Sequence, residues 1–280
     1  MTETLNWDHT MVDVTNLQDA IDYFNSKGLA FTPGGHHEYW GTKNALDYFG
    51  LNYIELLTIA NKEKAKAFPY ENNSAIHDAV EDYFAGIQRI TTIAIQTDNI
   101  EETHQRLEGL GLNVGDITDG KRVDPAGKLI QWKIFYVNDE LVNHLPAPFF
   151  IQWGNNDDQR REDLKKQGLI KFHPAGDLFV KQAIFNVSDP EEAAKQWSAL
   201  LQAEVVSEGD TYTINIGDKQ LVFKAGVENR LFKLIFHGAK QPEKLQLGQI
   251  AQYNLGNNIR LKKRVKSVKK LILRVSSLIY

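Results

Sequence analysis

Residues 7–24 read WDHTMVDVTNLQDAIDYF, and this stretch decides the fold. The run from Trp7 to Val14 is rich in strand-forming residues. Asn16 follows as a candidate helix N-cap, with Asp19 three residues later, because short polar side chains accept hydrogen bonds from the free amides of a helix start. After the cap, apolar residues recur on a helical period at Leu17, Ala20, Ile21 and Phe24. The stretch therefore predicts a strand followed by an amphipathic helix.

The same signature occurs twice more along the chain. The run Ile90 to Thr97 precedes Asn99, and the run Val180 to Val187 precedes Asp189, with Pro190 at the first helical position. Several short strand-like runs follow each predicted helix. A repeat at this spacing predicts an α+β fold built from three βαβββ modules.

The repeats set the expected domain organisation. We expect the first two modules, about residues 5–60 and 88–155, to pair into one cleft-forming domain over residues 1–155, joined by a helix at about 75–84. Residues 156–177 are expected to form a linker, residues 178–240 a third, appended module, and residues 241–280 a basic C-terminal segment. Because a lone module would leave its sheet uncovered, the third module is expected to pair with a second chain, which predicts a homodimer.

The composition excludes several classes of site. The 280-residue chain has no cysteine, so it has no disulfide framework, thiolate nucleophile, zinc finger or iron-sulfur cluster, and any metal must be held by nitrogen and oxygen. It shows no signal peptide and no apolar run long enough to span a membrane, which predicts a cytoplasmic protein. The net charge is −4, and residues 259–280 hold eight Lys or Arg and no Asp or Glu, so the other 258 residues carry −4 − 8 = −12 and would repel nucleic acid.

The C-terminal segment has a pattern of its own. Apolar residues recur there at steps of four and three, between lysines and arginines, which predicts an amphipathic cationic helix. We favour packing of its apolar stripe on the acidic body or on a second subunit, and contact with an anionic membrane surface is the alternative. The stripe consists of Leu261, Val265, Val268, Ile272, Val275 and Ile279.

The first module contains motifs with a known counterpart. Asp8-His9 lies in its first strand, Gly34-Gly35-His36-His37 and Gly41-Thr42-Lys43-Asn44 follow, and Tyr53-Ile54-Glu55-Leu56 lies in its last strand. This series resembles the glyoxalase-like domain of the vicinal oxygen chelate superfamily. The second module is similar through Arg122 and the strand from Phe149 to Trp153. The resemblance implies a ligand cleft between paired modules and a divalent metal that acts as a Lewis acid.

Strand alternation indicates which residues face that cleft. Trp7, His9, Met11 and Asp13 are expected on one face of the first strand, and Glu55 shares a face with Tyr53 in the last strand. The resemblance implies that His9 and Glu55 bind the metal, with His37 as the third ligand or as a general base, so Glu55 and His37 are the catalytic candidates. A hydrogen-bonded His9–Glu55 pair without metal is an equal alternative.

The second module offers weaker ligands. Alignment of Asn99 on Asn16 places Thr92 opposite His9, and matching of the last strands places Gln152 opposite Glu55. Threonine and glutamine are poor transition-metal ligands, so a symmetric four-ligand site is not expected. The residues expected to contact the ligand are Thr42, Asn44, Thr92, Arg122, Phe150 and Gln152.

These observations predict a protein that binds a small oxygenated molecule in the cleft. Metal-assisted lyase, isomerase or dioxygenase chemistry is one reading, and binding or sequestration without catalysis is the other. No nucleotide cofactor is expected, because Gly34-Gly35 is followed by neither a phosphate loop nor dinucleotide-binding spacing.

Overall fold

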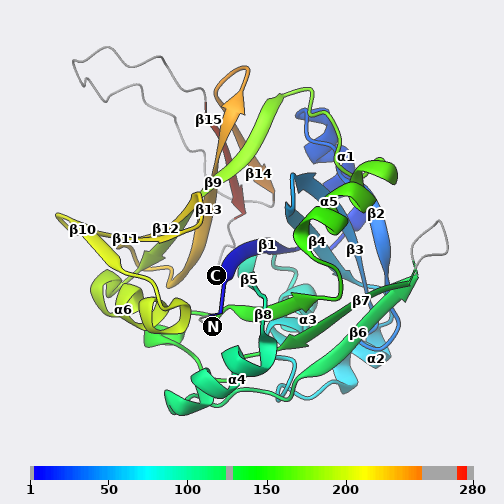
Figure 1. Cartoon of the computed structure of the whole chain (residues 1–280). Helices are drawn as coiled ribbons and strands as arrows, with labels where there is room; N and C mark the ends of the chain where they lie inside the picture. Colours follow the sequence, from blue (N-terminus) through cyan, green and yellow to red (C-terminus); the bar gives the residue numbers. More distant parts are fainter. Residues whose placement is uncertain (1–2, 124–128, 248–269, 276–280) are drawn as a thin grey trace, which may run out of the picture.

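The computed structural model describes residues 3–123, 129–247 and 270–275 (Figure 1). The N-terminal half of the described chain forms an eight-stranded mixed sheet in the order β2-β3-β4-β1-β5-β8-β7-β6. The strands are β1 (Leu5–Asp13), β2 (Thr32–His37), β3 (Thr42–Phe49), β4 (Asn52–Ile59), β5 (Arg89–Thr97), β6 (Thr118–Val123), β7 (Leu129–Phe135) and β8 (Phe149–Trp153).

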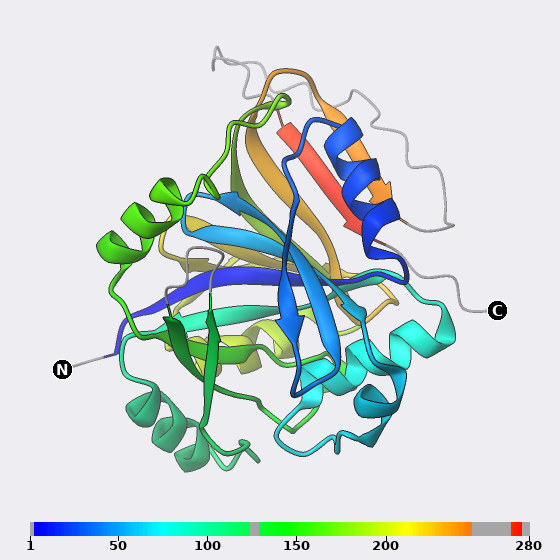
Figure 2. The same cartoon turned by 90° about the vertical axis from the view of Figure 1, so that its right-hand side faces the viewer.

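This first sheet has two similar halves. Strand β1 pairs in parallel with β4, and β5 pairs in parallel with β8, while β1 and β5 meet in antiparallel at the centre. Helix α1 (Leu17–Ser26) follows β1, and α4 (Ile100–Gly109) follows β5. The predicted α+β class is confirmed, and both sheets curl (Figure 2).

The predicted helix boundaries are confirmed by their hydrogen bonds. The side chains of Asn16, Asn99 and Asp189 each accept a backbone N–H of the first helical turn. Gly28 and Gly111 lie just after α1 and α4 with φ of +84° and +82°. In this left-handed region a glycine ends a helix without steric cost.

The third repeat continues into a second sheet built by this same chain. The seven described strands have the order β10-β11-β12-β9-β13-β15-β14, and β9 pairs in parallel with β12 as β1 does with β4. The expectation of a second chain came from an uncovered sheet, and packing of this sheet on the first sheet removes that reason, so the homodimer stays a prediction. The elements are β9 (Gly176–Val187), α6 (Pro190–Leu201), β10 (Val205–Glu208), β11 (Thr211–Ile216), β12 (Lys219–Ala225), β13 (Arg230–Ala239), β14 (Glu243–Leu247) and β15 (Lys270–Val275).

The two sheets share a core. Buried side chains from β1, such as Trp7 and Val12, belong to the same apolar cluster as Phe185 of β9 and Phe236 of β13. The rings of Phe49 and Phe236 lie 5.0 Å apart between centroids. One face of the first sheet is therefore covered by the second sheet, and the opposite face carries a separate cluster.

The predicted C-terminal helix is wrong where the structure describes it. Lys270–Val275 forms β15, which lies between β13 and β14 (Figure 2). Its backbone pairs in antiparallel with Lys233 to His237. Leu271, Leu273 and Val275 also alternate as in a strand, so this short pattern fits a helix and a strand equally. Pairing with β13 favours the strand. The remaining residues of the predicted helix lie outside the described part of the chain.

The other helices connect the modules. These are α2 (Lys62–Ala67), α3 (Ser74–Ala85), the short helix η1 (Val142–His144) and α5 (Asp157–Lys166). Helix α3 confirms the connecting helix predicted at 75–84, whereas α5 lies within the predicted linker. None of the helices in the described ranges is long and apolar enough to span a bilayer. The cytoplasmic location and the domain bounds stay predictions.

The role of β15 leads to a stability prediction. Removal of residues 259–280 should lower the free energy of unfolding by on the order of 3 kcal/mol or more, because both β13 and β14 lose a ladder of backbone hydrogen bonds at about 1 kcal/mol each. Urea unfolding and the melting temperature measure this. An unchanged melting temperature, together with loss of salt-sensitive pelleting on anionic liposomes, would favour the membrane-surface alternative.

Candidate functional site

A cavity of about 70 Å³ lies on the face of the first sheet that is turned away from the second sheet. We call it the cleft cavity. A bound water needs roughly 10–15 Å³ of such volume, so it has room for several waters or a small organic molecule. Its histidine, amide and carboxylate side chains, His9, His37, Asn44 and Glu55, all come from β1 to β4. Its aromatic lining consists of Trp40, Tyr53, Trp132, Tyr136, Phe149 and Trp153.

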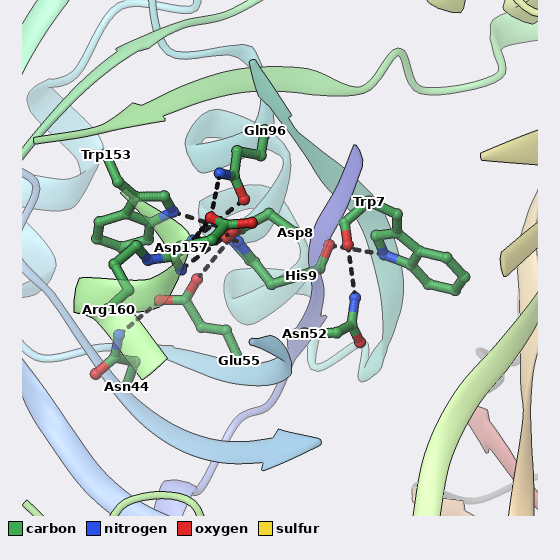
Figure 3. Close-up of polar contacts among 10 residues, drawn as sticks. All are labelled: Trp7, Asp8, His9, Asn44, Asn52, Glu55, Gln96, Trp153, Asp157 and Arg160. Atoms are coloured by element: carbon green, nitrogen blue, oxygen red, sulfur yellow. Dashed lines mark hydrogen bonds and ion pairs between the residues drawn. The ribbon is translucent and has the colours of Figure 1, made fainter. Parts of the chain in front are cut away.

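His9 and Met11 line this cavity by regular alternation, and β1 is irregular just before them. Trp7 pairs with Ile95 and His9 pairs with Ala94, so Asp8 is an extra residue in the ladder. Such a bulge breaks the alternation of side chains. Trp7 consequently packs in the core between the sheets, contrary to the prediction that it shares a face with His9, while Asp8 joins His9 at the site (Figure 3).

Asp8 accepts three side-chain hydrogen bonds. His9 Nδ1 lies 2.8 Å from Asp8 Oδ1, and Asp8 Oδ2 accepts from Trp153 Nε1 at 3.0 Å and from Arg160 Nη2 at 3.2 Å. Burial by itself would raise the pKa of the Asp8 carboxyl. The charge of Arg160 and the hydrogen bond with His9 outweigh burial and hold the pKa below its usual value, so Asp8 is a carboxylate.

Glu55 is the second buried carboxylate of the site. Its Oε1 accepts from Asn44 Nδ2 at 2.7 Å, and its Oε2 lies 3.5 Å from His9 Nε2. Burial would raise the pKa of Glu55, but the hydrogen bond and the charge of His9, followed by the charge of His37, lower it to about 2. The pKa of His9 is raised, since its contacts with Asp8 and Glu55 outweigh burial, which alone would lower it.

The position of His9 between two carboxylates has a chemical consequence. A neutral imidazole has a single N–H. If that proton is on Nδ1 toward Asp8, then the bare Nε2 faces an oxygen of Glu55 at 3.5 Å, and two acceptors would meet. A second proton on the ring removes this conflict, in agreement with the raised pKa of His9. The ring stacks on Tyr53 at 4.4 Å between centroids.

His37 lies at the same cavity with different partners. Its Nδ1 lies 2.9 Å from Thr42 Oγ1, and its Nε2 lies 3.4 Å from Asn44 Nδ2. Within residues 3–123, 129–247 and 270–275, no three His, Asp or Glu side chains are placed to hold one metal ion. The predicted ligand set of His9, Glu55 and His37 is thus not assembled as a group of three. Only the first two converge.

Three residues that the sequence placed at the ligand lie elsewhere. The hydroxyl of Thr92 donates to the carbonyl of Ala147 and lines a different cavity, with Asp78 and His144. The side-chain oxygen of Gln152 accepts from the amide of Ile100 at the start of α4. Phe150 stacks on Phe135 in the core between the sheets. Arg122 lies on β6, and its side chain is outside the described part.

Strand register explains the misplacement of Gln152. Met11 pairs with Glu55, and Ala94, which superposes on Met11 when Asn99 is placed on Asn16, pairs with Phe149. Phe149 is therefore the counterpart of Glu55, and Gln152 points to the opposite face because side chains alternate along a strand. In the second sheet the counterparts of His9 and Glu55 are Gln182 and Val222. Neither supplies an acid or an imidazole.

The sequence missed Arg160 and the part played by Asp8. Arg160 lies on α5 in a charged stretch that is typical of a solvated linker, yet the residue is 8% exposed. It also lines a second cavity of about 100 Å³, which shares Trp153 with the cleft cavity. Asp8 stood next to His9 in the motif, but a regular strand would have turned it away from the cavity.

A family model and one solved structure support the fold. The family model described as "Glyoxalase-like domain" matches residues 7–201. The crystal structure of a hypothetical protein from Staphylococcus aureus superposes with a TM-score of 0.72 at 19% identity, over 97% of this chain and all of that one. The Mn(II)-bound glyoxalase from Novosphingobium aromaticivorans gives a TM-score of 0.44 at 11% identity, over 81% of this chain and 63% of that one. No curated protein matches the sequence.

The shifted pKa of Glu55 predicts a pH dependence of stability. A carboxylate whose pKa falls from 4.5 to about 2 on folding stabilises the protein above pH 4.5, and this contribution is lost as the pH falls toward 2. The full shift corresponds to about 3 kcal/mol. In Glu55→Gln, urea unfolding between pH 5 and 2 should lose this part of the acid slope.

The control for this experiment is Glu63→Gln, which changes an exposed glutamate of α2. It should keep the acid slope of the unmodified protein. Equal slopes in the two variants would contradict the lowered pKa of Glu55.

The contribution of His9 to stability has the opposite sign. The pKa of His9 is raised on folding, so protonated His9 stabilises the fold below pH 6.5, and this contribution is lost as the pH rises through the folded-state pKa.

Proposed function

Because the chain belongs to the glyoxalase-like domain family, we propose that it binds a small, uncharged molecule with an apolar body and adjacent oxygen atoms in the cleft cavity. The observation that carries this proposal is the ionised Glu55 in an otherwise aromatic cavity, beside His9, His37 and Asn44. Ligand sites of small molecules commonly combine an apolar lining with a few placed polar groups, and groups with shifted pKa values mark functional sites.

The lining supports an aromatic or otherwise flat ligand body. Trp132, Tyr136 and Phe149 lie on one side, from the second half of the sheet, and Trp40 and Tyr53 come from the first half. Aromatic side chains pack favourably edge to face or offset against another ring. A ligand ring between these walls would direct its substituents to the polar wall of β1 to β4.

The charges of the site favour neutral ligands. No lysine or arginine is among the described residues that line the cleft cavity, so a phosphate or carboxylate would find no bidentate partner there. The ionised Glu55 would repel such an anion. It would instead accept a hydrogen bond from a ligand hydroxyl, which is stronger than a bond between neutral groups.

This proposal predicts selective binding of neutral vicinal oxygens. Catechol, a neutral ring with two adjacent hydroxyls, should quench the fluorescence of the tryptophans that line the cavity, and benzoate should not. Glu55→Gln should weaken catechol binding by about 10-fold to 100-fold, because a hydrogen bond to a charged acceptor contributes roughly 1.5–3 kcal/mol.

Thr92→Val is the matched control for the binding experiment. Thr92 was also a candidate from the sequence, but it lines a different cavity, so its removal should leave catechol affinity unchanged. Equal loss of affinity in both variants, or tighter binding of benzoate than of catechol, would contradict the proposal.

A metal-assisted reaction is the second candidate function, and one observation favours it. His9 Nε2 and Glu55 Oε2 converge at 3.5 Å, and Asp8 contacts the other ring nitrogen, as carboxylates commonly do in metal-bound histidines. A divalent cation would be held by these two side chains, and when bound it would act as a Lewis acid on a substrate oxygen. Lyase, isomerase or dioxygenase activity would follow from that chemistry.

Titration with Mn²⁺ or Zn²⁺ followed by calorimetry tests this second candidate. The unmodified protein should bind one ion, and His9→Ala should abolish binding because one of two protein ligands is lost. His37→Ala should bind nearly as well as the unmodified protein, since Thr42 and Asn44 hold that ring. Absence of binding by the unmodified protein would remove the metal-assisted candidate and leave the binding function.

A further inference from the structure

We propose that Arg160 is a positioning residue of the cleft cavity: from α5 it holds the Asp8 carboxylate in the place from which Asp8 fixes both His9 and Trp153. This inference rests on the proposed function of the cavity. Helix α5 lies outside the βαβββ elements of the first sheet, so it adds a component to the site that the repeat itself does not supply.

Arg160 is held on several sides. Its Nη2 donates to Asp8 Oδ2 at 3.2 Å, and its Nη1 donates to Gln96 Oε1 at 3.1 Å. The guanidinium carbon lies 4.3 Å from the centre of the Trp153 ring, within range of a cation–π interaction (Figure 3). Asp157 adds a second link between α5 and the sheet, since its Oδ1 accepts from Gln96 Nε2 at 2.8 Å.

The start of α5 is itself fixed. Asn156 and Gln159 form a reciprocal capping box at its N-terminus. Such a cap satisfies two of the free amides of the first turn. The helix therefore holds the backbone of Arg160 in a defined position. A planar guanidinium needs such a position to reach several hydrogen-bond partners at once.

Asp8 depends on this arginine. The carboxylate is 3% exposed, and a buried charge without a partner is costly. Asp8 Oδ1 contacts His9 Nδ1. Asp8 Oδ2 accepts hydrogen bonds from Trp153 Nε1 and Arg160 Nη2. Without the guanidinium, the Asp8 carboxylate would turn toward water and could not keep all of these contacts.

The two residues that Asp8 holds define the cavity. A carboxylate at Nδ1 keeps a proton on that nitrogen and directs Nε2 of His9 to Glu55. Trp153 lines both the cleft cavity and the second cavity beside α5, so the orientation of its indole sets the wall between them. Arg160 thus acts on the site through Asp8, without lining the cleft cavity itself.

Proton NMR separates this role from a purely structural tie between α5 and the sheet. The spectra follow the Nδ1–H resonance of His9 and the Nε1–H resonance of Trp153, assigned with His9→Ala and Trp153→Phe. Arg160→Met keeps most of the apolar stem and removes the charge. Arg161→Met is the matched control, because Arg161 is the next residue of α5 and is exposed.

In Arg160→Met we expect loss of the downfield His9 Nδ1–H resonance and an upfield shift of the Trp153 Nε1–H resonance, and Arg161→Met should retain both. Arg160→Lys should restore the His9 resonance, because its ammonium can pair with Asp8, while Trp153 stays shifted for lack of the planar stack. A folded Arg160→Met protein with both resonances at their original positions would overturn the proposal.

Should Arg160→Met fail to fold, Arg160→Lys decides alone: a shifted Trp153 resonance with a retained His9 resonance supports the proposal, and any other pattern overturns it. The spectra are recorded without metal or ligand. Failure of catechol and Mn²⁺ to bind would therefore overturn the proposed function and leave this test of Arg160 intact.

Discussion

The buried imidazole of His9 between two carboxylates is the interaction on which the rest of the site depends. Asp8 contacts one ring nitrogen at 2.8 Å, and Glu55 faces the other at 3.5 Å. Two buried carboxylates demand positive charge nearby, and His9 and Arg160 supply it. The aromatic side chains of the lining offer these charges few hydrogen-bond partners.

Of the two described sheets, only the first carries the His9–Glu55 pair. In the first sheet the inner strands carry His9 and Glu55, and the same positions of the second sheet carry Gln182 and Val222. Val222 packs with Ile184 and Ile235 in a small apolar cluster. The second sheet covers the opposite face of the first and completes a common core, so it supports the site from behind without repeating its chemistry.

The family match and the superposition on the Staphylococcus aureus protein bear on different questions. The first assigns the chain to the glyoxalase-like domain family over residues 7–201, and the second extends the likeness of fold to 97% of the chain, including the second sheet. At 19% identity the superposition carries the fold alone. The proposal of a ligand therefore rests on the charges and distances in the cleft cavity.

The sequence by itself determined the repeated strand–helix units, the three helix caps at Asn16, Asn99 and Asp189, and the pair His9 and Glu55, since these follow from local pattern and short-range hydrogen bonds. Tertiary structure decided the rest. The bulge at Asp8 reversed the face of Trp7, and register turned Gln152 out of the cleft cavity, because a shift of one residue exchanges the two faces of a strand. Pairing with β13 and β14 made Lys270–Val275 a strand, and the folding of α5 onto the sheet brought Arg160 to Asp8. These contacts join residues far apart in the chain, and no local pattern encodes them.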